Sequence, residues 1–236
     1  ILLVFLASFL WCNIVQEIGV DLDWKKNSII YLSTLAARRL PGSIIHIIGR
    51  VGMYKFYGQS VKLVALASAI EYLMIVISGM VAILLFIPLI IRKLFPLWIL
   101  LFLTLIVLII AIRSNNNGLQ LQKINGFGSL PKINQNKLFF WVIGYLLIWV
   151  VGGFLLLMLI HSIDLDSIII WYQSVFSWVL SGVIGMLITF LPSGLGVVEV
   201  SLSSSLSKII GIPVAISVAL LSRIIQTMID IVISMI

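Results

Sequence analysis

The order of apolar and polar positions along the chain predicts long helices joined by short connectors. Apolar stretches cover residues 1–15, 61–91, 97–112, 138–160, 168–190 and 212–236. A helix of about 20 apolar residues is long enough to cross a bilayer, and several of these stretches reach that length. We therefore expect an all-α, polytopic helical membrane protein with about six to eight helices.

Two segments interrupt this pattern with proline and glycine. The first begins at Pro41 and Gly42; the second holds Pro192, Gly194 and Gly196, and the two prolines are 151 residues apart. A break at membrane depth survives only where protein or a wet cavity satisfies the freed backbone groups. Paired interruptions at corresponding places in two halves are typical of a transporter binding site. The sequence therefore predicts two broken or re-entrant segments in a pseudo-repeated arrangement.

A polar stretch near the middle, residues 113–137, carries four Lys or Arg and no acid. We interpret it as a loop that joins two pseudo-halves, residues 1–112 and 138–236. Together they form a single integral membrane domain, residues 1–236. Because both ends of the sequence are apolar, we expect it to be a fragment of a longer chain.

Composition and charge support a membrane class. Hydrophobic residues make up 62% of the chain and charged residues 10%, whereas about 25% are charged in a soluble domain. The net charge of +7 comes without a basic stripe interleaved with aromatics, so it favours anionic lipid over nucleic acid as a partner. Residues 38–62 and 113–137 hold nine Lys or Arg, against two at 92–93. The positive-inside rule then has both breaks enter from the cytoplasmic side.

Charged side chains also occur inside the apolar stretches. Arg50 follows the first break and Glu71 lies one helix later, while Glu199 follows the second break and Arg223 lies one helix later. A charge at the bilayer centre costs about 2.5–3.5 kcal/mol on insertion scales, so such groups usually pair or face water. We expect ionic contacts among these four residues near the centre. The alternative is that they are helix-end charges whose side chains reach the membrane surface.

A helix that restarts after a break presents free N–H groups and a positive dipole end, which suits a phosphate or carboxylate. Gly194 and Gly196 would let the backbone approach such a ligand closely. Arg38 and Arg39, just before the first break, add positive charge, and His46 is expected to bond a backbone group there. The sequence thus predicts an anion site at the breaks.

Other chemistry is less well supported. Asp21 with Asp23 and Asp164 with Asp166 form Asp-x-Asp pairs, but they lie in short connectors where solvated acids are the simpler interpretation. The five serines between 201 and 207 suit close helix packing better than a polar path. We predict no catalytic residue, no metal site and no cofactor.

Several of these segments resemble a known family. Residues 31–42, Gly49-Arg50, residues 192–199 and Ser222-Arg223 are similar to the flippase-like transmembrane domain of lysylphosphatidylglycerol synthases. The resemblance covers nearly the whole chain apart from the family's first helix. The family more often has Gly-Gly-Leu-Gly and Arg-Glu, where this chain has Ser193-Gly194 and Val198-Glu199. The resemblance implies broken helices around a lipid-accessible cavity in a prokaryotic cell membrane. It carries over no aminoacyl transfer, which belongs to a separate soluble domain in the synthases.

From these observations we expect a lipid flippase or scramblase-like protein that moves an anionic phospholipid or lipid-linked glycan precursor between leaflets. One alternative is a membrane glycosyltransferase that uses polyprenyl-phosphate sugars. Another is a non-catalytic membrane anchor or partner of a cell-envelope enzyme, and a homo-oligomer is compatible with each. The predicted substrate-binding residues are Arg38, Arg39, Pro41, Gly42, His46, Arg50, Glu71, Pro192, Gly194, Gly196, Glu199 and Arg223.

Overall fold

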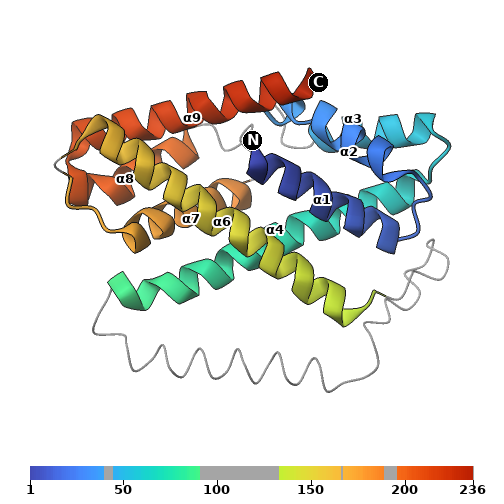
Figure 1. Ribbon diagram of the computed structural model, residues 1–236, viewed down its shortest axis with the longest axis horizontal. Coiled ribbons are helices and arrows are strands. Elements are labelled where there is room, and N and C mark those ends of the chain that lie inside the picture. The colour runs from blue at the N-terminus through green and yellow to red at the C-terminus, as the bar shows by residue number, and fades with distance from the viewer. Residues whose placement is uncertain (40–44, 91–132, 166, 189–195, 236) are drawn as a thin grey trace.

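The computed structural model describes residues 1–39, 45–90, 133–165, 167–188 and 196–235, and within them it is all-helical (Figure 1). This confirms the predicted all-α class. The helices are α1 (Leu2–Glu17), α2 (Trp24–Ser33), the 3-10 turn η1 (Ala36–Arg39), α3 (Ile45–Phe56), α4 (Val61–Ile90), α6 (Gln135–Ile163), α7 (Trp171–Leu187), α8 (Val197–Ile210) and α9 (Ile212–Ser234). The predicted helix at 97–112 and most of the predicted loop at 113–137 lie outside the described residues.

Three of these helices are long and apolar enough to cross a membrane. They are α4 over Val61–Ile87, α6 over Gln135–Ile163, and α9 over Ile212–Ser234. By contrast, α3 has 12 residues and α8 has 14. At 1.5 Å per residue, helices of that length cover only about half of a 30 Å hydrocarbon core. The first break is therefore followed by a short helix, α3.

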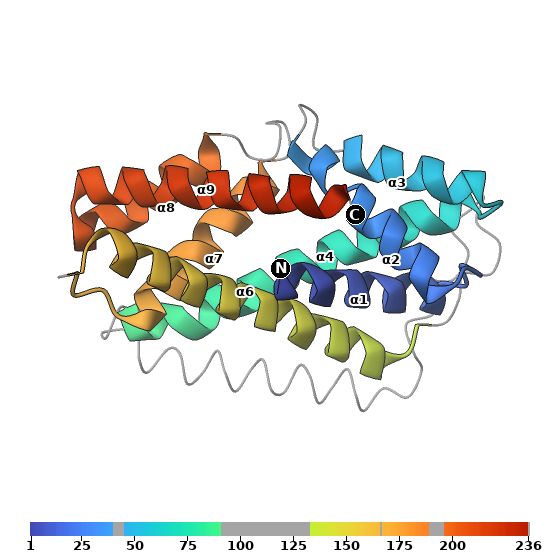
Figure 2. The same ribbon diagram turned by 45° about the horizontal axis from the view of Figure 1, so that its top comes forward.

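The short and long helices form two similar units of opposite direction. In the first unit α2 runs inward from one end of the molecule, α3 runs back out, and α4 then crosses the full length (Figures 1 and 2). The helices α7, α8 and α9 follow the same course from the opposite end. Helix α8 begins 152 residues after α3 (Val197 against Ile45), and α9 begins 151 residues after α4 (Ile212 against Val61). The three-helix units thus form an inverted repeat.

This arrangement corrects the expected entry of the breaks. The charge count placed both on one side, but α2 and α3 lie at one end of the molecule and α7 and α8 at the other (Figure 2). The basic residues are not the cause, since leaving out the buried Arg50 changes the count only from nine to eight against two. The expectation failed because it treated the apolar stretch 168–190 as a full crossing, whereas α7 has 17 residues and runs inward from its own end of the molecule (Figure 2).

A glycine forms the reversal between the short and the long helix in each unit. Gly58 has a φ of 73° between α3 and α4, and Gly211 has a φ of 79° between α8 and α9. Residues with a Cβ rarely adopt this left-handed backbone, whereas glycine adopts it freely. The same turn chemistry therefore recurs at equivalent places in the repeat.

Each unit also has its own hydrophobic core. One core gathers buried side chains of α1 to α4, with Trp141 and Tyr145 of α6 and Ile233 of α9. The other gathers side chains of α6, α8 and α9. Between α6 and α7 the backbones pack closely: a Cβ at Gly153 would lie 2.5 Å from the Cα of Val175. A third cluster, Ala82 and Phe86 of α4 with Val175, Val179 and Val183 of α7, packs the two units against each other.

Candidate functional site

The most buried charges of the described chain form an ion pair between α3 and α4. The Nη1 of Arg50 donates to the Oε2 of Glu71 at 2.6 Å. Arg50 is 0% exposed and Glu71 is 5% exposed. A buried pair of this kind is stable only when both charges remain, because a single buried charge is strongly unfavourable. The pair therefore ties the short helix to the long helix that follows it.

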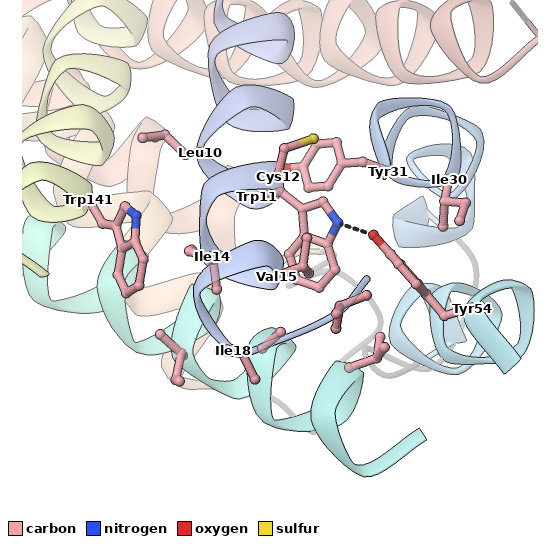
Figure 3. Close-up of a cluster of buried hydrophobic side chains, with 14 of the residues drawn as sticks. Leu10, Trp11, Cys12, Ile14, Val15, Ile18, Ile30, Tyr31, Tyr54 and Trp141 are labelled. Carbon is pink, nitrogen blue, oxygen red and sulfur yellow. Dashed lines mark hydrogen bonds between the residues drawn. The ribbon is translucent and has the colours of Figure 1, made fainter. Parts of the chain in front are cut away.

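Two aromatic rings hold the Arg50 guanidinium. Its Cζ lies 4.0 Å from the ring centroid of Trp11 and 4.6 Å from that of Tyr31. The face of an aromatic ring attracts a cation, by about 2 kcal/mol or more where water is excluded. Trp11 belongs to α1 and Tyr31 to α2, and Figure 3 shows the two rings side by side; both helices therefore contact Arg50.

A chain of hydrogen bonds supports these rings. The Trp11 indole N–H donates to the Tyr54 hydroxyl at 3.0 Å, as Figure 3 shows, and Tyr54 donates to the Asn27 Oδ1 at 2.7 Å. The Asn27 amide in turn donates to the Leu22 carbonyl at 2.9 Å. Trp11, Tyr54 and Asn27 are fully buried, so each bond satisfies a group that water does not reach. The chain fixes α1, α2 and α3 relative to one another.

Arg38 forms the more accessible edge of the site. Its Nη2 donates to the Tyr31 hydroxyl at 2.9 Å and lies 3.9 Å from the Glu71 Oε1, and its side chain is 33% exposed. Asp230 of α9 acts on Arg38 electrostatically. Burial raises the pKa of Tyr31 to about 12 despite the opposing charge of Arg38, so this hydroxyl stays protonated. Arg38 is therefore placed between Glu71 and the rim of the molecule.

Glu71 is the point where the positive groups meet. Besides its contacts with Arg50 and Arg38, its carboxylate interacts electrostatically with His46. The structure thus brings together four predicted residues, Arg38, His46, Arg50 and Glu71, from η1, α3 and α4. These elements are the ones that flank the first break, since η1 ends at Arg39 and α3 begins at Ile45.

Part of the hydrogen-bonding capacity here is unused by the described chain. The Nε and Nη2 of Arg50, the Oε1 of Glu71 and the hydroxyl of Tyr145 are buried without a hydrogen-bond partner. Tyr145 lies on α6, within electrostatic reach of Arg38, Arg50 and Glu71. A buried polar group without a partner costs about 1–3 kcal/mol, so four such atoms at one place form a costly arrangement. We call Arg38, Arg50, Glu71 and Tyr145 the Arg50 cluster.

The second ion pair joins α8 to α9. The Nε of Arg223 lies 3.2 Å from the Oε1 of Glu199, and both side chains are 15% exposed. The other carboxylate oxygen of Glu199 accepts a hydrogen bond from the backbone N–H of Gly196 at 2.8 Å. Glu199 therefore also caps the start of α8, as the glutamate of a capping box does.

The expected ionic contacts exist, but as two separate pairs. Each pair lies within its own unit and joins the short helix to the long helix after it, with the signs reversed. The expectation that Glu199 and Arg223 hold the halves together is wrong, because both belong to the second unit. The physical reason is local: a helix and the helix that directly follows it through a tight turn bring their facing side chains together.

The remaining predicted residues are only partly described. Gly196 precedes α8 with a φ of 82°. Arg39 ends η1, and nothing is described of its side chain. Pro41, Gly42, Pro192 and Gly194 lie outside the described residues.

Sequence reasoning missed the aromatic and amide partners of the site. Trp11, Tyr31, Tyr54 and Tyr145 stand in apolar stretches, where an aromatic residue is indistinguishable from ordinary core. Asn27 was interpreted as the end of a polar connector, whereas its side chain is fully buried and hydrogen-bonded. No signal in a single sequence separates these residues from their neighbours.

Two other expectations concern the serines and metals. Ser201, Ser203 and Ser207 donate to carbonyl groups of their own helix, and Ser205 pairs with Ser177 of α7 at 2.7 Å. Of these serines, Ser205 therefore contributes to the packing of α8 against α7. In the described ranges, no group of three or more His, Cys, Asp or Glu is placed to hold a metal ion.

The chain was also compared with known proteins. Neither a scan against protein-family models nor a search of curated proteins returns a match.

Proposed function

We propose that the chain is a multi-pass integral membrane protein of a prokaryotic cell membrane. Three helices long enough to cross a bilayer support this, and so does the surface they present. Soluble proteins rarely expose a continuous apolar stripe of this length. The exposed apolar side chains along α9 are Ile216, Leu220, Leu221, Ile224, Ile225, Met228, Ile231 and Val232.

Its function, in this proposal, is to move an anionic phospholipid or lipid-linked glycan precursor between leaflets, as a flippase or scramblase does. The observation that carries the proposal is the Arg50 cluster, which sits in the core at the break between η1 and α3. Intramembrane charges are expensive and by default mark a functional path. Inverted repeats with interrupted helices are likewise typical of transporters, whose substrate sites lie between the repeats.

The proposed path begins at Arg38, the most exposed cation of the cluster. An anionic headgroup would contact Arg38 first and then reach Arg50, while the acyl tails stay in lipid. The Glu199–Arg223 pair, at the equivalent place of the second unit, would hold α8 against α9 while the first unit opens. Membrane lipids are thus the proposed partners, and the protein would act without catalysing a reaction.

The test is lipid movement in proteoliposomes that contain the full-length protein. Fluorescent anionic phospholipid is quenched from outside, so lipid that moves outward becomes quenchable. Arg38→Gln removes the accessible charge, and Lys25→Gln is the matched control, because Lys25 is an exposed cation at the far end of α2. We expect movement in the wild type and the control, and a clear loss in Arg38→Gln.

The same experiment separates the alternatives. No movement above empty liposomes, across several lipids that include polyprenyl-phosphate carriers, would refute translocation and favour a membrane anchor. Release of free sugar or a new glycosidic product from a polyprenyl-phosphate sugar would instead favour the glycosyltransferase.

A further inference from the structure

The two nitrogen edges of the Arg50 guanidinium are used very differently. Nη1 bonds Glu71, whereas Nε and Nη2 have no hydrogen-bond partner within the described chain. Nε and Nη2 lie on the same edge of the planar group and point their hydrogens in parallel. This edge is the fork that binds two oxygens of one carboxylate or phosphate at once. A complete fork is therefore present, fully buried and unused.

The fork is also held in place before any ligand arrives. Glu71 fixes the opposite edge of the guanidinium, and the rings of Trp11 and Tyr31 lie against it at 4.0 and 4.6 Å. A donor group whose position is already fixed loses little entropy when it binds, which is how a preorganised site gains affinity. An arginine whose only role was to neutralise Glu71 would not need two aromatic rings to fix the position of its guanidinium.

A second donor comes from the other half of the chain. The Tyr145 hydroxyl on α6 is 3% exposed and has no hydrogen-bond partner within the described chain. Tyr145 packs in the same buried cluster as Trp11 and Tyr31, the two rings that contact Arg50, and it interacts electrostatically with Arg50, Arg38 and Glu71. A phenol hydroxyl donates well to an oxyanion, and its neighbour Arg38 offsets the repulsion that Glu71 would exert on a second negative group.

We propose that the Nε/Nη2 fork of Arg50 and the hydroxyl of Tyr145 form an occluded receptor for one phosphate oxyanion. This deepens the proposed function, because it names the chemistry that the headgroup site recognises and assigns Tyr145 to it. The phosphate comes either from a lipid headgroup or from free inorganic phosphate. In the conformation described, the receptor is closed to solvent, so the side chains that cover it move when the ligand enters.

The test measures binding rather than movement, with the purified full-length protein in detergent. The probes are inorganic phosphate, a short-chain phosphatidate and, as an uncharged control, the matching diacylglycerol. Arg50→Lys keeps the charge but removes the fork, and Tyr145→Phe removes only the hydroxyl. Lys55→Arg is the matched control, because it exchanges the same two cations at an exposed position of the same helix.

We expect saturable binding of a phosphate probe but not of diacylglycerol. Arg50→Lys should weaken it at least tenfold, Tyr145→Phe about three- to tenfold, and Lys55→Arg not at all. Without ligand, Tyr145→Phe should unfold at the same or a higher temperature than the wild type, because it removes an unpaired buried hydroxyl. If Arg50→Lys does not fold, the phosphate affinity of Tyr145→Phe decides whether the receptor exists.

Binding of phosphate itself would identify free phosphate as sufficient, and binding of phosphatidate alone would identify the lipid headgroup. Absence of saturable binding to both probes would overturn the receptor, as would unchanged affinity in Tyr145→Phe. Binding and lipid movement are separate readouts. If the protein binds a phosphate probe but moves no lipid in proteoliposomes, only the proposed function is refuted. If it moves lipid but binds no phosphate probe, only this inference is refuted.

Discussion

Replacing Arg50 with methionine tests whether the buried pair organises the first unit. The change removes the guanidinium whose Nη1 lies 2.6 Å from the Oε2 of Glu71. Breaking a buried pair by removing one partner costs about 3–5 kcal/mol. Arg38, at 3.9 Å from the other oxygen of Glu71, remains as a weaker partner, so we expect a loss of about 3 kcal/mol.

A double-mutant cycle measures whether the charges of Arg50 and Glu71 are energetically coupled. Glu71→Leu alone leaves Arg50 unpaired and should cost a similar amount. The double variant Arg50→Met/Glu71→Leu contains neither buried charge, and replacing such a pair with apolar groups is often nearly neutral. We therefore expect the double variant to recover at least about 2 kcal/mol relative to the sum of the two single losses.

The assay is unfolding of the purified protein in mixed micelles by a denaturing detergent, followed by helical circular dichroism. Lys55→Met is the matched control, because it makes the equivalent change at an exposed position of the same helix and should cost about 0.5 kcal/mol or less. If the two single losses add within about 0.5 kcal/mol, the pair is not energetically coupled, and the argument from burial is refuted.

Three further predictions use the same unfolding assay. Gly153→Ala should destabilise by about 1–3 kcal/mol, because its Cβ would lie 2.5 Å from the backbone Cα of Val175. Gly52→Ala, in α3 with no atom within 4 Å of the added Cβ, should stabilise by up to about 1 kcal/mol, and equal effects at the two sites would contradict the packing of α6 on α7. Tyr54→Phe should cost about 2 kcal/mol or more, since it leaves a buried donor and a buried acceptor without a partner; a cost below about 0.5 kcal/mol would argue against the hydrogen-bond chain. Glu199→Gln keeps an acceptor for the α8 cap but removes the charge that pairs with α9, so the loss should be about 1 kcal/mol and should shrink at high salt.

The two ion pairs occupy equivalent places in the inverted repeat. Both join a short helix to the long helix that follows a glycine turn, yet the first pair is almost fully buried and the second is 15% exposed on each side. The aromatic groups around Arg50 account for this difference, since Trp11 and Tyr31 contact the first guanidinium. Equivalent positions in the repeat have therefore acquired different chemistry, with the unused donors concentrated in the first unit.

Much of the helical framework could be predicted from the sequence. The apolar stretch at 61–91 became α4, the stretch at 138–160 became most of α6, and the charged stretch after the first break became the short helix α3. These outcomes depend on hydrophobicity and on chain-breaking residues, which act locally and are visible in one dimension. The spacing of Arg50 with Glu71, and of Glu199 with Arg223, was also sufficient to single out the residues that form ion pairs.

Only the tertiary structure decided which end each unit enters from and what surrounds the charges. The direction of α7 and α8 relative to α2 and α3 depends on packing among helices far apart in the chain, and the apolar stretch 168–190 does not by itself show that α7 is too short to cross. The same holds for the receptor chemistry. Trp11 and Tyr31 come from two helices, and their spacing along the chain does not reveal that they meet at Arg50. Charge and hydrophobicity can be deduced from single positions, whereas a hydrogen-bonding site is a property of distances between helices.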